Sequence, residues 1–111
     1  MEMALQKQEQ ILCKALHTDL GKSKTESVMC EIGLVQGEIR WMKQHLGRLC
    51  RQKHVRTPLA QFAAKSYQSP SPYGNVLIMS PWNYPVLLTL EPLVDAIAAG
   101  NTAVVKPSAY A

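Results

Sequence analysis

The sequence predicts an α/β chain in which an amino-terminal αα-hairpin precedes one βαβ unit of parallel sheet. Three observations lead to this fold class: two amphipathic helical segments before residue 50, an apolar run at residues 76–79, and a β-branched run at residues 102–105. A helical pattern over residues 86–98 lies between the two runs. Strand, helix and strand in this order form a parallel crossover, which is almost always right-handed.

The first predicted helix covers residues 1–20 and ends at Gly21-Lys22. Its apolar positions recur at helical spacing on one face: Leu5, Leu12, Leu16 and Leu20. Ser23 and Glu26 then form a capping-box pattern, in which the serine hydroxyl and the glutamate carboxylate satisfy unpaired amides at a helix start. A second helix is therefore expected to begin directly after a tight turn.

The second predicted helix is long and has a continuous apolar seam. The seam residues alternate at spacings of four and three: Val28, Ile32, Val35, Ile39, Met42, Leu46 and Leu49. Two such helices joined by a short turn form an antiparallel αα-hairpin. Gly33, Gly37 and Gly47 each cost a helix up to about 1 kcal/mol relative to alanine. We therefore expect the backbone to pack closely against another element at these glycines.

Residues 51–73 are rich in proline and serine, and the sequence predicts connections around one short strand at residues 64–68. The predicted organisation is a helical hairpin at 1–54, a linker with one strand at 55–74, and the βαβ unit at 75–111. The apolar run at 76–79 predicts a strand buried on both faces. Gly100 is expected to end the crossover helix. Glu91 and Asp95 of that helix are expected to face solvent.

Ligands of open α/β sheets bind beyond the carboxyl ends of the strands. The Pro81-Trp82-Asn83 loop follows the first strand, and Lys106-Pro107-Ser108 follows the second. The two loops should therefore lie at the same edge of the sheet.

Composition narrows the functional class. The 111 residues are 47% hydrophobic and 18% charged, which is typical of a globular protein. No acidic residue lies between Glu38 and Glu91, so this stretch is basic and could form a nucleic-acid site. It lacks the aromatic side chains on which an RNA binder stacks bases. A surface that faces solvent or another subunit is therefore favoured. No run reaches the roughly 20 apolar residues of a membrane span. The three cysteines are widely spaced, which predicts reduced thiols in the cytoplasm and no metal site. Core packing is the expected role of Cys30, Cys50 and Trp41.

Several motifs resemble the aldehyde dehydrogenase superfamily: SPWNYP, a helix that ends in AIAAGN, and VVKPS. The upstream segments DLGKSKTESVMCEIGLV and VRTPLAQFAAKSY look most like the branch that handles fatty and aromatic aldehydes. The resemblance runs from about Gln8 to Ser108. It implies an amino-terminal fragment whose residues 75–111 begin an incomplete Rossmann-like cofactor-binding domain. It also implies that the strand within 55–74 belongs to an oligomerisation arm.

The resemblance assigns roles to individual residues. Asn83 matches the asparagine that donates to the oxyanion; the plainer interpretation is an asparagine that caps the following helix. Positions that contact NAD or NADP in the family match the following residues: Met79, Ser80, Pro81, Trp82, Lys106 and Ser108. Their plainer roles are packing at a strand end and, for the lysine, solvation. The implied substrate is a small-molecule aldehyde, and the implied full-length form is a homodimer.

The family's cysteine nucleophile, general-base glutamate and glycine-rich cofactor turn match no segment of these residues, and Ala109 stands where the family carries a glutamate. The isolated chain is therefore expected to be inactive. The alternative hypothesis is a catalytically dead helical module for interaction or oligomerisation.

Overall fold

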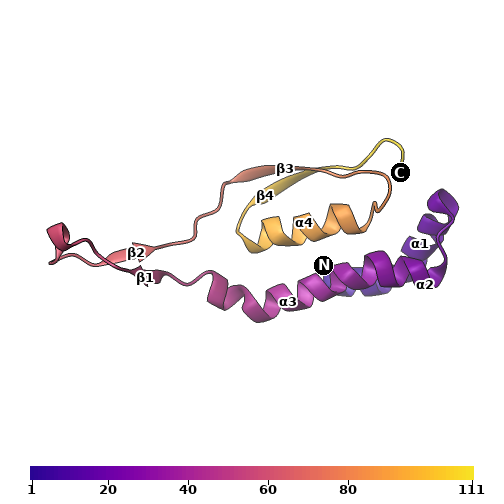
Figure 1. Cartoon of the computed structure of the whole chain (residues 1–111). Helices are drawn as coiled ribbons and strands as arrows, with labels where there is room; N and C mark the ends of the chain where they lie inside the picture. The colour runs from indigo at the N-terminus through magenta and orange to yellow at the C-terminus, as the bar shows by residue number, and fades with distance from the viewer.

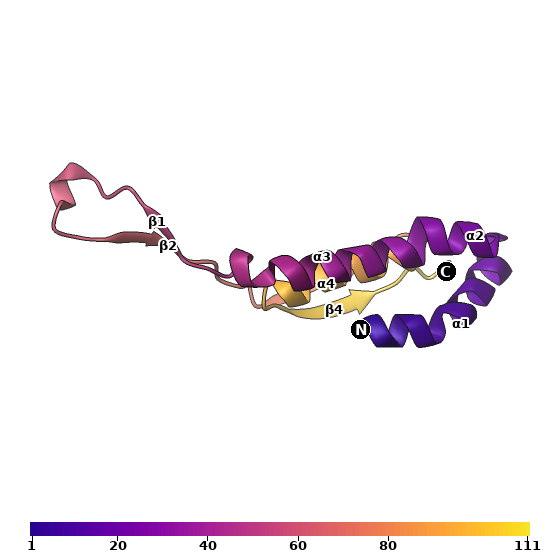
Figure 2. The ribbon, with the colours of Figure 1, turned by 90° about the horizontal axis from the view of Figure 1, so that it is seen from below.

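The computed structural model describes residues 1–111, and its helices form the predicted antiparallel hairpin (Figures 1 and 2). Helix α1 (Glu2–Leu20) is followed by α2 (Lys24–Ser27), a π-helical turn η1 (Val28–Ile32) and α3 (Gly33–Leu49). The last three segments follow one another without a break, so the hairpin consists of two long helical halves.

The turn between the two helical halves has the glycine helix end and the serine cap that the sequence predicts. Gly21 has the left-handed φ of 68° and donates its backbone N–H to His17 O at 3.0 Å. Ser23 Oγ accepts from Glu26 N at 3.1 Å, which confirms the serine half of the capping box.

The three helical glycines differ in their surroundings. A Cβ at Gly33 would lie 2.7 Å from the carbonyl oxygen of Val28, because the π turn brings that carbonyl toward the glycine. At Gly37 and Gly47 a Cβ would meet nothing within 4 Å. The predicted close approach to another element is therefore wrong at all three, since the one close neighbour belongs to the same helical segment.

An arm projects from the helical body, and its secondary structure is richer than predicted (Figure 1). Strands β1 (Lys53–Val55) and β2 (Ser66–Gln68) pair antiparallel and enclose a 3₁₀ turn η2 (Leu59–Gln61). The predicted strand overlaps β2, whereas β1 was not predicted. The expected boundary after residue 54 falls inside β1.

The βαβ unit consists of β3 (Asn75–Met79), α4 (Leu87–Ala98) and β4 (Thr102–Lys106). The strands are parallel neighbours, with Asn75 opposite Thr102 and Met79 opposite Lys106. The helix stops as predicted: Gly100 has φ 84°, its N–H donates to Ile97 O, and Asn101 N donates to Ala96 O, each at 2.9 Å. These two bonds form a Schellman motif.

Helix α4 lies between the sheet and α3 (Figures 1 and 2). A core of Leu5, Val35, Ile39 and Val94 joins α1, α3 and α4. The opposite face of the sheet is uncovered, and Leu77, Met79 and Val104 are 62%, 69% and 64% exposed. The prediction that residues 76–79 are buried on both faces is therefore wrong for this chain, because only one face has a covering helix.

Asp95 is exposed, as predicted, whereas Glu91 is half-buried. They lie toward Glu38 of α3, and the pKa of Glu38 is raised by partial burial, by the charges of Asp95 and Glu91, and by a hydrogen bond with Asp95. Helix α4 contains no basic residue that could neutralise the group. The packing of α3 on α4 thus brings three carboxylates together.

The contact at Gly33 leads to a matched pair of substitutions. Gly33→Ala should lower the free energy of unfolding by about 1–3 kcal/mol, because its methyl group overlaps a backbone carbonyl that cannot rotate away. Gly37→Ala has open space and should raise the same quantity by up to about 1 kcal/mol. Urea unfolding followed by circular dichroism measures both. Equal effects at the two positions would contradict the close contact.

The carboxylate cluster predicts a pH dependence of stability. The pKa of Glu38 is raised in the folded chain. Just above the ordinary glutamate pKa of about 4.3, the folded chain therefore binds more protons than the unfolded chain. The contribution of Glu38 to the free energy of unfolding falls as the pH rises through that window. Glu38→Gln should therefore raise the melting temperature near pH 7, and the gain should vanish near about pH 4.

Glu2 provides a control of opposite sign. A hydrogen bond from Lys43 is the main cause of its lowered pKa, so Glu2→Gln should lower the melting temperature near neutral pH. A melting temperature of Glu38→Gln that is unchanged or reduced near neutral pH would show that the three carboxylates do not repel one another.

Candidate functional site

The candidate site lies at the sheet edge where β3 and β4 end. Met79 is opposite Lys106 in the parallel register, and the Ser80 N–H donates to Lys106 O at 3.2 Å. The loop that follows β3 and the segment that follows β4 therefore leave the sheet side by side. This is the edge at which open α/β sheets bind ligands.

The residues that match cofactor-contacting positions fall into two groups at this edge. Met79, Pro81, Trp82 and Lys106 are exposed, and the Lys106 ammonium takes part in none of the ion pairs of the chain. The two serines are engaged within the protein instead. Ser80 is buried and its Oγ accepts from Thr89 Oγ1 at 2.6 Å, while Ser108 Oγ accepts from Tyr110 N at 3.0 Å.

Asn83 is exposed in the loop between β3 and α4. Its Oδ1 accepts from Tyr84 N at 3.1 Å, and its backbone oxygen accepts from Lys22 Nζ at 3.0 Å. Asn83 Nδ2 makes no hydrogen bond within the chain. Asn83 does not cap α4, because the first free amides of that helix have another partner.

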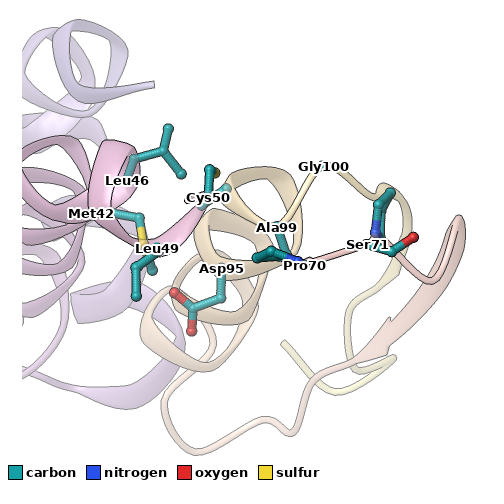
Figure 3. Close-up of a pocket in the computed structure, with 11 residues that line it drawn as sticks. Met42, Leu46, Leu49, Cys50, Pro70, Ser71, Asp95, Ala99 and Gly100 are labelled. Atoms are coloured by element: carbon teal, nitrogen blue, oxygen red, sulfur yellow. The ribbon is translucent and has the colours of Figure 1, made fainter. Parts of the chain in front are cut away.

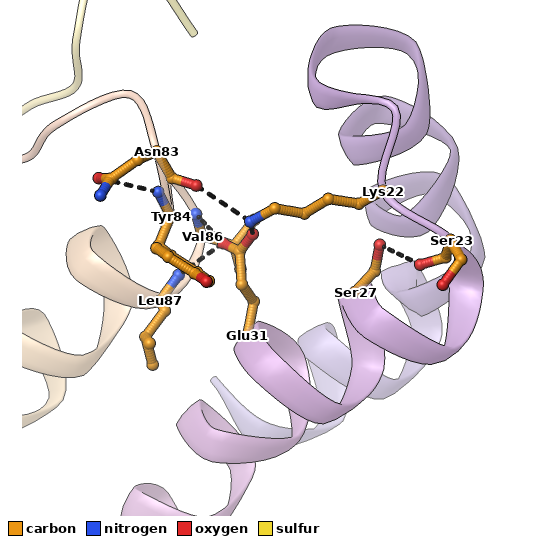
Figure 4. A network of polar contacts seen from close by, with 8 residues as sticks. All are labelled: Lys22, Ser23, Ser27, Glu31, Asn83, Tyr84, Val86 and Leu87. Carbon is orange, nitrogen blue, oxygen red and sulfur yellow. Dashed lines mark hydrogen bonds and ion pairs between the residues drawn. The ribbon is translucent and has the colours of Figure 1, made fainter.

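That partner is Glu31, a completely buried glutamate of the helical hairpin (Figure 4). Its Oε2 accepts from the backbone amides of Val86 at 2.8 Å and Leu87 at 3.2 Å. Its Oε1 lies 2.5 Å from Lys22 Nζ, and Lys22 is itself only 8% exposed. The carboxylate thus stands at the positive end of the α4 dipole and next to a cation.

Lys22 joins this network to the loop of Asn83 in two ways. In addition to its bond to the Asn83 carbonyl, its ammonium lies 3.8 Å from the centre of the Tyr84 ring, a cation–π geometry. Three segments therefore meet at one buried charge pair: the turn after α1, the π turn, and the start of α4.

Sequence patterns alone do not single out Lys22 and Glu31 as partners. Lys22 lies at a predicted helix end, and its partners are 9 and 61 residues away. One signal was available: Glu31 is four residues before the seam residue Val35, so a carboxylate lies on the apolar face of the predicted helix. A buried charge on such a face needs a partner.

A pocket of about 370 Å³ lies at the opposite end of α4 (Figure 3). Its walls include Leu46, Leu49, Cys50, Asp95 and Gly100. Because the 12 residues of α4 span about 18 Å at ~1.5 Å per residue, Cys50 lies far from the loop of Asn83.

None of the three residues expected in the core belongs to it. Cys50 is exposed and Trp41 is 43% exposed, stacked on His45 with ring centroids 4.2 Å apart. Cys30 is half-buried and Cys13 is buried. Cys13 belongs to α1, Cys30 to the π turn, and Cys50 follows α3, so no cysteine belongs to the two segments that leave the sheet at this edge.

A parallel βαβ unit with an exposed asparagine and an exposed lysine at one edge is typical of α/β enzymes that bind a ligand beyond their strands. The chain belongs to the aldehyde dehydrogenase family, whose family model matches residues 1–111. This confirms the resemblance seen in the SPWNYP, AIAAGN and VVKPS motifs. The family consists of oxidoreductases.

Individual relatives agree with this assignment. The chain is 46% identical to 4,4'-diaponeurosporen-aldehyde dehydrogenase of Staphylococcus aureus over 97% of its own length and 24% of that protein. It is 43% identical to human aldehyde dehydrogenase family 3 member B1, over 94% of the chain and 22% of that protein.

A solved structure is also similar: the substrate-bound state of Staphylococcus aureus AldH, with a TM-score of 0.93 and 47% identity. The match covers 96% of this chain and 23% of that one. The chain thus spans about a quarter of the length of the relatives it matches. None of its helices has the length and hydrophobicity required to cross a lipid bilayer.

Proposed function

We propose that these residues form the amino-terminal part of an NAD(P)-dependent aldehyde dehydrogenase, which oxidises aldehydes to carboxylic acids. Family membership supports the reaction class. The observation that carries the proposal for this segment is the state of Asn83. Its carboxamide oxygen accepts from Tyr84 N, whereas both Nδ2 hydrogens are without a partner in the chain and are available to a ligand at the sheet edge.

Asn83 serves as the oxyanion donor in this proposal. When a nucleophile adds to an aldehyde, the carbonyl oxygen becomes negatively charged, and a fixed N–H donor stabilises that charge more than it stabilises the neutral carbonyl. Because Asn83 carries no ionisable proton, it can only bind the oxyanion. The nucleophile and the general base lie outside these residues in this proposal.

The exposed part of the sheet edge fits a dinucleotide. Met79, Pro81 and Trp82 offer flat apolar contacts, and the Lys106 ammonium is free to donate to ribose hydroxyls or phosphate. Ser80 and Ser108 would contribute through their backbone atoms, since their hydroxyl groups are engaged within the chain. When bound, NAD or NADP supplies the hydride acceptor.

The proposal extends to domain organisation. The proposed units are residues 1–54 with the helical hairpin, residues 55–74 as a linker with a strand of an oligomerisation arm, and residues 75–111 as the start of a Rossmann-like cofactor-binding domain. We also propose a homodimer for the complete enzyme and a cytoplasmic location, which three unpaired thiols support.

A helical interaction module is the second candidate function. Leu59 and Phe62 at the tip of the arm are both 86% exposed, and one face of the sheet is uncovered. Such apolar surface is typical of a protein-binding module.

The first test uses a chimera in which residues 1–111 replace the matching part of the Staphylococcus aureus dehydrogenase of known structure. Asn83→Ala should lower kcat by about two to three orders of magnitude, as for other oxyanion donors, and leave the dissociation constant of the cofactor nearly unchanged. A raised dissociation constant with an unchanged kcat would assign Asn83 to cofactor positioning and refute the oxyanion role.

The second test uses the isolated chain. It should not form NADH from a long-chain aldehyde, because a covalent intermediate needs a nucleophilic thiol and no cysteine belongs to the loop of Asn83 or to the segment after β4. Absorbance of NADH measures turnover, with the unsubstituted chimera as the positive control. Turnover that disappears when Cys13, Cys30 or Cys50 is replaced by serine would show that one of these thiols is the nucleophile.

A further inference from the structure

The loop that carries Asn83 has few bonds of its own. Within it, the Tyr84 N–H donates to Asn83 Oδ1, and its neighbours Trp82 and Tyr84 are 56% and 37% exposed. Ser80 at its start is bonded to Lys106 and Thr89, and Tyr84 O accepts from Leu88 N. The remaining contacts, to the backbone of Asn83, Val86 and Leu87, come from the helical hairpin through Lys22 and Glu31. Both residues are at least nine-tenths buried, so their geometry is determined by the hairpin.

We propose that Lys22 and Glu31 are positioning residues that orient the carboxamide of Asn83. This inference rests on the proposed oxyanion role of Asn83. Neither residue touches a reacting atom. They act through the loop: Lys22 holds the peptide group that follows Asn83, and Glu31 holds the first amides of α4.

The planarity of one peptide bond links Lys22 to the carboxamide. The carbonyl of Asn83 and the N–H of Tyr84 belong to the same rigid peptide unit. Lys22 Nζ donates to that carbonyl at 3.0 Å, and the N–H of the same unit donates to Asn83 Oδ1 at 3.1 Å. When the ammonium fixes the peptide plane, it also fixes the donor that orients the side chain and thereby the direction of Nδ2.

Glu31 fixes the other end of the loop. Its Oε2 accepts from Val86 N and Leu87 N, which have no partner inside α4, and its Oε1 holds the Lys22 ammonium at 2.5 Å. The carboxylate thus sets the position of the cation relative to the helix start. If either residue is lost, the other remains as an unpaired buried charge, and the loop loses one of its two anchors.

A purely structural role makes a different kinetic prediction. Loss of general stability would reduce the amount of active enzyme or weaken cofactor binding. Loss of orientation at Asn83 affects an interaction that is strongest in the transition state. It should therefore lower kcat and leave the KM for the cofactor unchanged.

The test uses the chimera that contains residues 1–111, with active enzyme quantified by titration. Lys22→Met should lower kcat by about tenfold to a hundredfold, the range expected when a reacting group is misplaced by about 1 Å. The KM for NAD should change by less than roughly twofold. Glu2→Gln is the matched control, because it removes exposed ion pairs with Arg40 and Lys43 in the same hairpin without touching the loop. Its kcat should equal that of the parent.

A double-mutant cycle decides whether Lys22 acts through Asn83. In the Asn83→Ala background, Lys22→Met should cause no further loss of kcat. If the double variant loses kcat by the product of the two single losses, Lys22 does not act through Asn83, and the positioning role is wrong even if Asn83 is the oxyanion donor. If Asn83→Ala alone left kcat unchanged, the oxyanion role itself would fail, and that outcome is visible before Lys22 is altered.

A milder variant covers the case in which Lys22→Met does not fold. Glu31→Gln keeps an acceptor for the Val86 and Leu87 amides and removes the charge opposite Lys22. The same cycle is then measured with Glu31→Gln, with the same expected non-additivity. A kcat of Glu31→Gln equal to that of the parent would overturn the inference.

Discussion

A completely buried carboxylate must be neutralised, and Glu31 is neutralised from two directions. Removing an ion from water costs several kcal/mol in a real protein, and this penalty is offset only when good geometry and additional hydrogen bonds are present. Glu31 has both, with Lys22 Nζ at 2.5 Å and two amides at the positive end of α4. The partners of Glu31 come from the helical hairpin and from the βαβ unit. A shift of one of these parts relative to the other would therefore leave a buried charge without a partner. The apolar core of Leu5, Val35, Ile39 and Val94 supplies attraction between the same parts, but apolar contacts are not directional and do not define the start of α4 to within one residue.

The π turn explains how the hairpin can present this carboxylate and still pack. Ser27, Glu31, Ile32 and Val35 are all completely buried within nine consecutive residues. The π turn Val28–Ile32 adds backbone to the helix at this point, so that the adjacent residues Glu31 and Ile32 both face the interior. Gly33 is required directly after it, because the carbonyl of Val28 occupies the space of a side chain. A glycine that is unfavourable for helix propensity thus permits the geometry that buries the charge.

Local features of the fold were predictable from sequence, whereas features that depend on distant partners were not. The αL glycine at Gly21, the serine cap at Ser23 and the Schellman stop at Gly100 follow from short-range chemistry and are present as predicted. Strand β1 carries no such signal, because its three residues are all exposed and pair only with β2.

The candidate site was predictable to the same extent, in its local features only. The neighbouring loops at one sheet edge follow from strand order, but the contact between Glu31 and the start of α4 joins residues that are 55 positions apart. Only the polar residue on the apolar helix face indicated it.

The two ends of α4 differ in their electrostatics, and this difference favours a fixed geometry at the end near Asn83. At the amino-terminal end, the helix dipole meets an anion that is held by a cation, so every charge is compensated. Further along the helix, Glu91 near its middle and Asp95 in its last turn lie near Glu38, no base lies on α4, and the pKa of Glu38 is raised. The favourable electrostatic energy of the helix is therefore concentrated at its start. The remainder of α4 is held by the apolar contacts of Val94 and by the backbone bonds of its stop at Gly100, so the charge pairing of the helix is confined to the end near Asn83.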